Sequence, residues 1–178
     1  MGDALKAINS RKSIRNYLDK PVKKELLEVI AAAGDKAPLG PALAIRVITD
    51  KELLTRIDQE TYDRMLNSGV PFSVERASLP GYRPLYSAPA FIIIASDPER
   101  GALGAAAAAE NMIIAATDLG LGSCFVVSPI QTVSDPAYAA GLALPEGCKP
   151  LAGVLLGYTG DPDVFSRKRI PADIAFIG

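Results

Sequence analysis

The stretch "APAFIIIAS" at residues 88–96 constrains the fold more than any other part of this chain. Nearly every position in it is apolar, and isoleucine occupies three consecutive positions. A strand with one face in water alternates apolar and polar residues, so a continuous apolar run of this length predicts a strand that is buried on both faces. The fold should therefore contain a central sheet flanked by helices.

A second apolar segment, "ALGAAAAAENMIIAATDLG" at residues 102–120, is too long for a strand and is rich in alanine, which favours helix. Its apolar residues surround most of the helix circumference, which predicts a central helix packed on several sides. The glycine at its end is expected to stop the helix.

The remaining segments alternate between strand and helix patterns. Residues 43–50, 123–127 and 149–158 are expected to be strands, since β-branched and apolar residues gather there. Helices are expected over residues 3–9, 22–34, 51–59 and 135–144, with Gly34 ending the second and with Asp50 and Asp135 as the N-caps of the last two. The resulting order predicts an α+β fold in one domain that spans residues 1–178.

Two segments have weaker patterns. Residues 13–21 should be extended, because Pro21 disfavours helix at the residue before it. Residues 60–88 are the least regular part and suit either a long covering loop or a partly helical flap. The segment with Phe72 and Tyr82 either lies over a functional site or is an ordinary surface loop in which these two side chains pack onto the core.

Composition excludes several classes of function. The chain of 178 residues has a net charge of −1 and no histidine. A near-neutral chain lacks the broad cationic excess of a nucleic-acid-binding protein, and a chain without histidine lacks the usual general base of hydrolytic triads and the commonest metal ligand. We therefore expect no metal site and no partnership with nucleic acid.

The distribution of cysteines and apolar runs bears on location. Cys124 and Cys148 form neither a closely spaced pair nor a disulfide framework, so reduced and buried thiols are expected. No apolar run has the length and continuity of a signal peptide or a membrane span. A soluble, cytoplasmic protein without a membrane partner is the expectation.

Glycine motifs give no nucleotide-binding site. The "GLG" at residues 120–122 lies after a helix and before a strand, whereas a dinucleotide-binding fingerprint needs the order strand, glycines, helix. It is therefore expected to be a helix stop with a tight entry to a strand. A phosphate-binding P-loop motif is absent from the sequence.

Two clusters of positive charge stand near opposite ends of this balanced chain: "RKSIR" at residues 11–15 and "RKR" at residues 167–169. Either cluster alone could be a solvated surface run. In extended backbone, alternate side chains share a face, so Arg11, Ser13 and Arg15 should point the same way, as should Arg167 and Arg169. Together these arginines and the hydroxyl would suit a phosphate monoester.

An ordered set of motifs carries a resemblance to a known family. The set begins with "INSRKSIRNYLDKPV", an amphipathic helix, "AP" and a strand ending in "VITD". It continues with "YSAPAFIII", "AENMIIAATDLGLGSCFV", "LLGYTGD" and "RKRIP". In this order, over essentially the whole chain, the sequence resembles the FMN-dependent nitroreductase family.

The resemblance implies an α+β fold with a central mixed or antiparallel sheet, a homodimer in which the C-terminal segment is exchanged with the partner subunit, and FMN at the subunit interface. The implied activity is that of an NAD(P)H oxidoreductase, in which NADH or NADPH reduces the flavin and a nitroaromatic, a quinone or a similar small-molecule electron acceptor reoxidises it. The cofactor performs this hydride chemistry, so no catalytic side chain is expected. The resemblance assigns three groups of residues to the flavin. The phosphate and the ribityl chain would be held by Arg11, Lys12, Ser13, Arg15, Arg167 and Arg169. The backbone of Val127 and Ser128 would lie at the ring edge, and the loop that reaches a partner's flavin would contain Pro38, Leu39 and Gly40.

Two departures from the family pattern affect the site. The loop "APLGPALA" at residues 37–44 is shorter than its family counterpart and lacks the asparagine and glutamine common there. This loss makes a flavin- or phosphometabolite-binding module with little turnover the alternative function. Glu110 stands where the family often has glutamine, and a carboxylate in so apolar a helix needs a partner, either structural or at the flavin edge.

Overall fold

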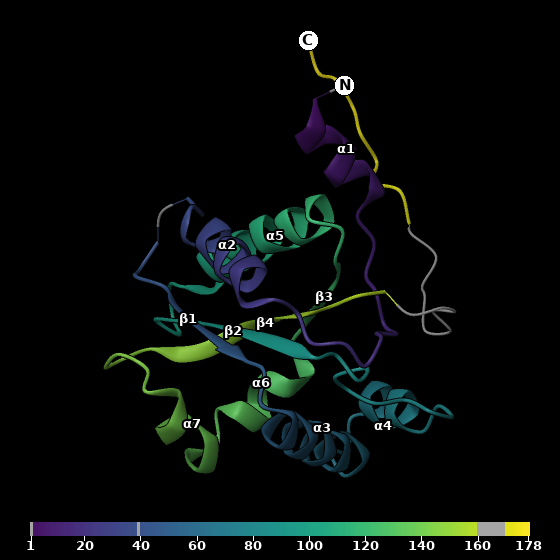
Figure 1. Cartoon of the computed structure of the whole chain (residues 1–178), viewed down its shortest axis with the longest axis vertical. Coiled ribbons are helices and arrows are strands. Elements are labelled where there is room, and N and C mark those ends of the chain that lie inside the picture. Colours follow the sequence, from purple (N-terminus) through teal and green to yellow (C-terminus); the bar gives the residue numbers. More distant parts are fainter. Residues whose placement is uncertain (1, 39, 160–169) are drawn as a thin grey trace.

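The computed structural model describes residues 2–38, 40–159 and 170–178. Its centre is a four-stranded sheet with the spatial order β1-β2-β4-β3 (Figure 1). Each pair of neighbouring strands is antiparallel. The four strands are β1 (Ala44–Ile48), β2 (Ala90–Ser96), β3 (Gly122–Val126) and β4 (Lys149–Gly157). The sheet that we expected to be mixed or antiparallel thus has antiparallel pairing between all four of these strands.

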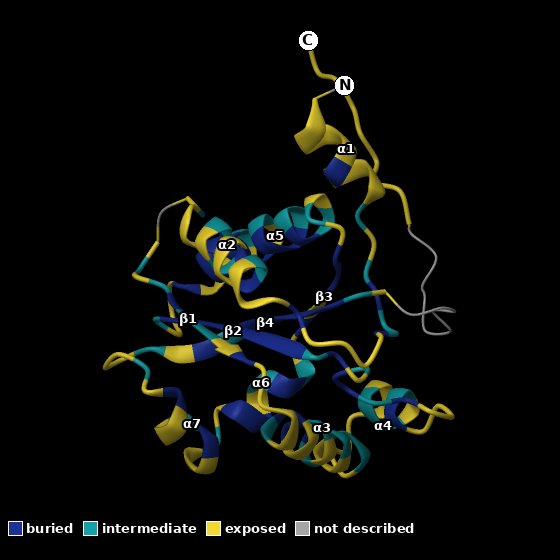
Figure 2. Ribbon diagram, viewed as in Figure 1, coloured by how far each residue is buried: buried dark blue, intermediate teal, exposed yellow. Residues whose placement is uncertain are grey.

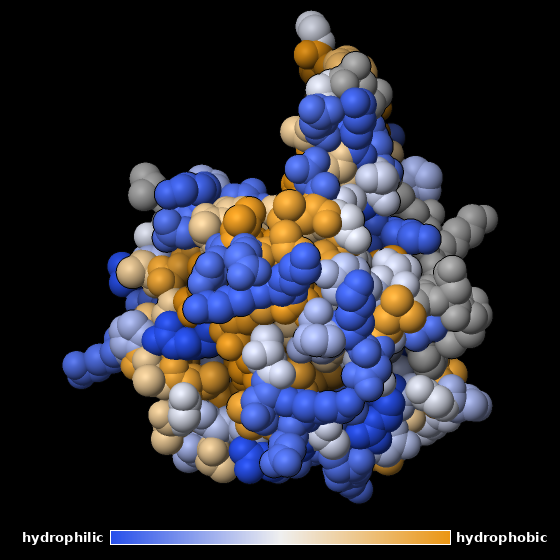
Figure 3. Space-filling model, viewed as in Figure 1, coloured by the Kyte–Doolittle hydropathy of each residue, from blue (hydrophilic) through white to orange (hydrophobic). Residues whose placement is uncertain are grey.

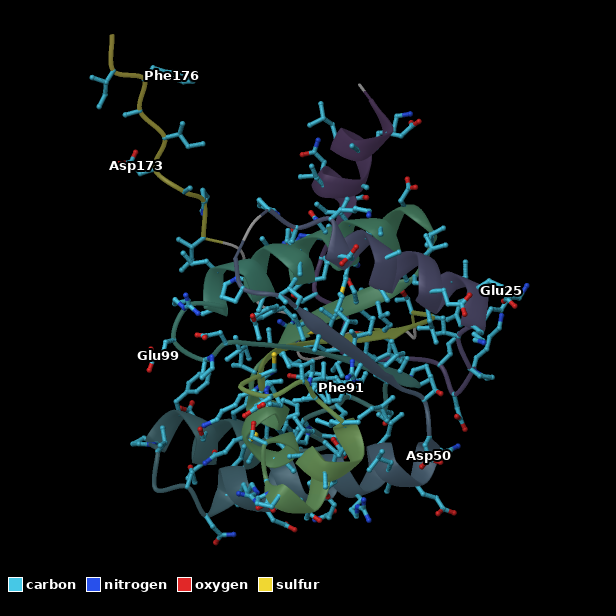
Figure 4. All side chains as sticks on the ribbon, turned by 90° about the vertical axis from the view of Figure 1, so that its left-hand side faces the viewer. Glu25, Asp50, Phe91, Glu99, Asp173 and Phe176 are labelled. Carbon is cyan, nitrogen blue, oxygen red and sulfur yellow. The ribbon has the colours of Figure 1, made fainter. Side chains whose placement is uncertain are left out.

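Strand β2 is the buried centre that its sequence predicts, with all seven residues buried. Ile92 and Ile94 belong to the core on one face of the sheet, and Phe91 and Ile93 belong to the core on the other face. The first face is covered by α2 (Lys24–Asp35) and α5 (Ala102–Asp118), and the second by α3 (Lys51–Leu66), α6 (Ser128–Val133) and α7 (Pro136–Leu142) (Figure 1). Figure 4 shows Phe91 between the sheet and the second group. Burial on both faces explains why this strand shows no alternation of polar and apolar residues.

Helix α5 (Ala102–Asp118) is the central helix expected from its composition. It packs against α2 (Lys24–Asp35), α1 (Asp3–Ser10) and three strands of the sheet. In Figure 2 the strands beneath it are largely dark blue, and α5 itself carries buried, intermediate and exposed residues. Gly120 follows the helix with a φ of 74°, a left-handed conformation that glycine adopts without strain. The "GLG" is therefore a helix stop before β3, as predicted.

The prediction that Gly34 ends the second helix is wrong. Gly34 lies inside α2, is buried, and faces Met112 of α5 so closely that an added Cβ would overlap its side chain. The helix ends at Asp35, with Lys36 as its C-cap. Close packing of two helices therefore explains this glycine, and its sequence position alone could not distinguish that role from a cap.

The expected irregularity of residues 60–88 is only partly correct. Helix α3 (Lys51–Leu66) continues through residues 60–66, and α4 (Pro71–Ala77) follows it. At the start of α3, Asp50 accepts a hydrogen bond of 2.7 Å from the backbone N–H of Leu53, which confirms its predicted role as N-cap. The segment is thus a partly helical flap, as the second of the two interpretations has it.

After β3 the structure differs from the expected strand over residues 123–127. The strand ends at Val126, a short helix α6 (Ser128–Val133) that we did not predict follows at once, and Phe125 is 42% exposed although a buried strand was expected. Phe125 therefore belongs to a surface at the edge of the sheet. Helix α7 (Pro136–Leu142) has Asp135 as its N-cap, as predicted.

Both ends of the described chain project from the body. Helix α1 and residues 170–178 both extend beyond the sheet in Figure 1, and Figure 4 shows that they are separate, with the segment that carries Phe176 running away from the body. The exposed apolar residues here are Leu5, Ile8, Ile170, Ile174, Phe176 and Ile177. Orange apolar atoms also gather at the surface around α2 and α5 in Figure 3. None of the helices in the described ranges combines the length and the hydropathy needed to cross a bilayer.

Candidate functional site

Residues 11–15 lie along the outer edge of β3. The N–H of Ile14 donates a hydrogen bond of 2.8 Å to the carbonyl of Ser123, and Ser13 and Ser123 form a parallel bridge. Gly122 permits this close approach, because a Cβ at that position would lie 2.9 Å from Cγ1 of Ile14. The expected extended backbone is therefore confirmed, and its pairing with Ser123 holds it along the outer side of β3.

Burial within the segment alternates. The side chain of Ile14 is buried in the core below the sheet, whereas Ser13 and Arg15 on either side of it are half-buried and Lys12 is exposed. Nη1 of Arg15 lies 3.4 Å from the carbonyl oxygen of Ser13, a long hydrogen bond. Ile14 thus anchors the segment, and the polar residues around it remain within reach of solvent and of a ligand.

Arg11 has a partner that the sequence did not assign to it. Its Nε lies 3.4 Å from Oε1 of Glu110 on α5. Glu110 is also not enclosed in an apolar interior as its sequence neighbours suggest, because its side chain is 52% exposed. The partner that we expected for this carboxylate is therefore a residue of the basic cluster itself, and the pair cancels one of the three cations at residues 11–15.

The second basic cluster, with Arg167, Lys168 and Arg169, lies outside the described residues. The chain that leads toward it does leave the sheet beside residues 11–15. Tyr17 and Thr159 form an antiparallel bridge, and the N–H of Leu18 donates to the carbonyl of Tyr158 at 3.0 Å. The end of β4 and the first basic cluster are thus held together at the same edge of the sheet.

Val127 and Ser128 lie at the point where β3 passes into α6. Val127 is the N-cap residue of this helix and is 60% exposed, and Ser128 is the first helical residue. The first N–H groups of a helix have no partner within that helix. Since this point directly follows the strand that residues 11–15 accompany, both predicted groups belong to one edge of the molecule.

Pro38 and Gly40 are not brought to that edge, and Leu39 lies outside the described residues. The loop leads from α2 into β1, the strand at the opposite edge of the sheet from β3. Ser96 at the end of β2 holds the loop there by donating a hydrogen bond of 3.0 Å to the carbonyl of Ala42. Within one chain, the loop and the basic segment therefore lie at opposite edges.

A turn before β2 forms a further polar cluster that the sequence reading did not identify. Tyr82 is buried, whereas Phe72 is exposed, so of the two only Tyr82 packs onto the core. The rings of Tyr82 and Tyr86 meet edge to face at 5.6 Å, and Nη2 of Arg76 donates to the hydroxyl of Tyr86 at 3.1 Å. Burial raises the pKa of the Tyr82 phenol well above its ordinary value. In the sequence, only the aromatic residues and prolines of this segment indicated such a cluster.

Beside this turn a cavity of about 690 Å³ opens between α3 and residues 17–22. Of the described residues that are predicted to bind the phosphate, none lines it. Its walls combine apolar side chains such as Leu54 and Leu85 with the ion pairs Lys51–Asp19 and Arg83–Asp58. The cavity and the basic edge are therefore separate features.

Helices on both faces of an antiparallel sheet, with a cationic segment bound to one edge strand, define an α+β protein. Residues 8–158 match the nitroreductase family. The chain belongs to that family, as the ordered motifs predicted.

Solved structures and a curated relative agree with this assignment. A nitroreductase with bound FMN from Bacteroides fragilis is 28% identical, with both chains covered completely and a TM-score of 0.85. A second nitroreductase with bound FMN, from Desulfitobacterium hafniense, is 25% identical with complete coverage of both chains and a TM-score of 0.89. The NAD(P)H-dependent FMN reductase of Bacillus subtilis is 25% identical over 97% of this chain and 72% of its own length. These likenesses confirm the nitroreductase-like fold.

Proposed function

We propose that this protein is an FMN-dependent NAD(P)H oxidoreductase that transfers electrons to a nitroaromatic, a quinone or a similar small molecule. The observation that carries the proposal is the attachment of residues 11–15 to β3 through the Ile14–Ser123 hydrogen bond, which holds the cations at an edge. Membership in the nitroreductase family and the FMN bound in two similar structures support it.

The chemistry of this edge fits the phosphate of FMN. A phosphate monoester carries nearly two negative charges at neutral pH, and arginine forms paired hydrogen bonds with such groups. Arg11, Lys12, Ser13 and Arg15 supply three cations and a hydroxyl within five residues, and Arg167 and Arg169 would follow from the end of β4. These residues would hold the phosphate and the ribityl chain.

The ring would lie against the turn from β3 into α6. There the backbone N–H groups of Val127 and Ser128 would orient the flavin edge by hydrogen bonds that require no particular side chain. When bound, FMN accepts a hydride from NADH or NADPH and gives electrons to the acceptor. The task of this chain is then to anchor the phosphate and to fix the ring, which is consistent with a sequence that contains no histidine.

A homodimer is part of the proposal. The loop with Pro38 and Gly40 lies at the β1 edge and the basic segment at the β3 edge, so only a second copy could bring such a loop to the flavin. The exposed apolar residues of α1 and of residues 170–178 would be buried in this dimer, with the C-terminal segment exchanged. We infer one domain over residues 1–178 and a cytoplasmic location, which two free cysteines fit.

One purification tests the proposed activity. The protein should be yellow, or become yellow on reconstitution with FMN, and the bound flavin should bleach when NADH or NADPH is added without oxygen. A yellow protein that neither nicotinamide reduces would instead support a flavin-binding module with little turnover. A colourless protein that cannot be reconstituted would refute both functions.

A further inference from the structure

Among the described residues, the carboxylate of Glu110 lies at the cationic edge, and the fold fixes its position. Helix α5 is held rigidly around it, since Ala109 before it is fully buried and Asn111 after it donates a hydrogen bond of 3.3 Å to the carbonyl of Ala33 on α2. The backbone of Glu110 therefore cannot withdraw from the site without breaking the packing of α5 against α2.

Arg11 is fixed equally well from the other side. It is the C-cap residue of α1, and its own N–H donates to the carbonyl of Ala7 at 2.9 Å. Its guanidinium meets Glu110 through Nε at 3.4 Å, and the side chains are 34% and 52% exposed. Both partners are thus accessible to a ligand as well as to each other.

We propose that Glu110 weakens the hold of this site on a phosphate by competing with it for Arg11. The inference rests on the proposed function and names the residue that sets how strongly the site prefers FMN to riboflavin, which is the same flavin without the phosphate. A phosphate that approaches Arg11 must share the guanidinium with an existing anion and is repelled by that anion. Glu110 thereby makes oxidised FMN easier to release than the cations alone would.

The opposite role, in which Glu110 only positions Arg11, is the weaker one on physical grounds. A single contact at 3.4 Å between half-exposed side chains restrains a guanidinium slightly, whereas a full negative charge beside a ligand with nearly two negative charges acts without any special geometry. Arg11 also keeps a second restraint at its backbone through the cap of α1.

The test measures the dissociation constants of FMN and riboflavin by quenching of flavin fluorescence, for the wild type and for Glu110→Gln. Glutamine keeps the size of the side chain and removes its charge. We expect Glu110→Gln to bind FMN about three- to ten-fold more tightly, with riboflavin affinity unchanged. Asp118→Asn, an exposed change of the same charge on the same helix, should leave both constants within about two-fold.

A second pair of proteins tests the route through Arg11. In an Arg11→Met background, the gain from Glu110→Gln should be clearly smaller than in the wild type, since no guanidinium remains to compete for and only the direct repulsion between Glu110 and the phosphate is relieved. An undiminished gain in that background overturns the competition for Arg11. If the wild type binds FMN and Glu110→Gln binds it equally or more weakly, the inference is overturned and the proposed function is not. A wild type that binds neither flavin overturns the proposed function, and this inference with it.

Discussion

Asp58 on α3 and Arg83 in the turn before β2 form an ion pair, with 2.5 Å between Oδ2 and Nε. The second carboxylate oxygen accepts a hydrogen bond of 2.7 Å from the backbone N–H of Leu85. The Asp58 side chain is only 14% exposed, so its charge depends on these two donors. One side chain of a helix thus fixes the turn that leads into the central strand.

Replacing Asp58 by alanine should therefore destabilise the protein by about 2–3 kcal/mol, because Arg83 and the N–H of Leu85 lose their acceptor together. Urea denaturation followed by circular dichroism measures the change in the free energy of unfolding. Asp63→Asn on the same helix is the control, since Asp63 is exposed, and it should change stability by less than about 0.5 kcal/mol. Equal effects of the two substitutions would contradict the role given to Asp58.

Gly122→Ala should disturb the contact between the basic segment and β3. The new Cβ would lie about 3 Å from Ile14 and from Oγ1 of Thr159, so one of these segments must move. We expect a loss of about 1–3 kcal/mol in the free energy of unfolding and a weaker affinity for FMN. Gly141→Ala has no neighbouring atom within 4 Å and lies in α7, so it should stabilise the protein by up to about 1 kcal/mol. An FMN affinity unchanged in Gly122→Ala would mean that the contact with β3 does not position residues 11–15 for the phosphate.

Arg15→Met should lower the affinity for FMN by about ten- to a hundred-fold, because a charge-assisted hydrogen bond to phosphate is worth about 1.5–3 kcal/mol. Riboflavin should bind as it does to the wild type. The matched substitution Arg100→Met removes an exposed cation that pairs with Asp97 away from this edge, and it should leave FMN binding unchanged. Isothermal titration calorimetry gives the ratio of the variant's dissociation constant to that of the wild type, for FMN and for riboflavin. A parallel loss of riboflavin affinity in Arg15→Met would place this arginine at the ring instead of the phosphate.

Asp135 gives a prediction about acid pH. The backbone N–H of Ala137, and then the guanidinium of Arg64, lower the pKa of this N-cap carboxyl. A lowered pKa stabilises the folded protein above the unfolded pKa of about 3.9, and this contribution disappears as the pH falls through the folded value. The stability advantage of the wild type over Asp135→Asn should thus be constant near neutrality and shrink below about pH 4. Thermal unfolding of both proteins from pH 7 to pH 3 measures it, and an advantage that stays constant over this range would contradict the assignment.

The sequence by itself determined the main elements. Continuous burial could be read from the isoleucines of β2, because a strand covered on both faces has no polar side to show. The alanine-rich pattern predicted α5, and local capping chemistry identified Asp50 and Asp135, since such bonds join residues two or three positions apart. The cationic cluster at residues 11–15 was likewise visible as a local pattern.

Only the tertiary structure decided which distant residues meet. Gly34 serves the contact with Met112 instead of a helix end, Glu110 pairs with Arg11, and Asp58 fixes the turn at Arg83. The strand order places the loop with Pro38 at the edge of the sheet opposite the basic segment. This order results from pairing between distant strands, so the sequence did not predict it. Each of these outcomes depends on contacts between residues far apart in the sequence, and periodicity and propensity describe only neighbours along the chain.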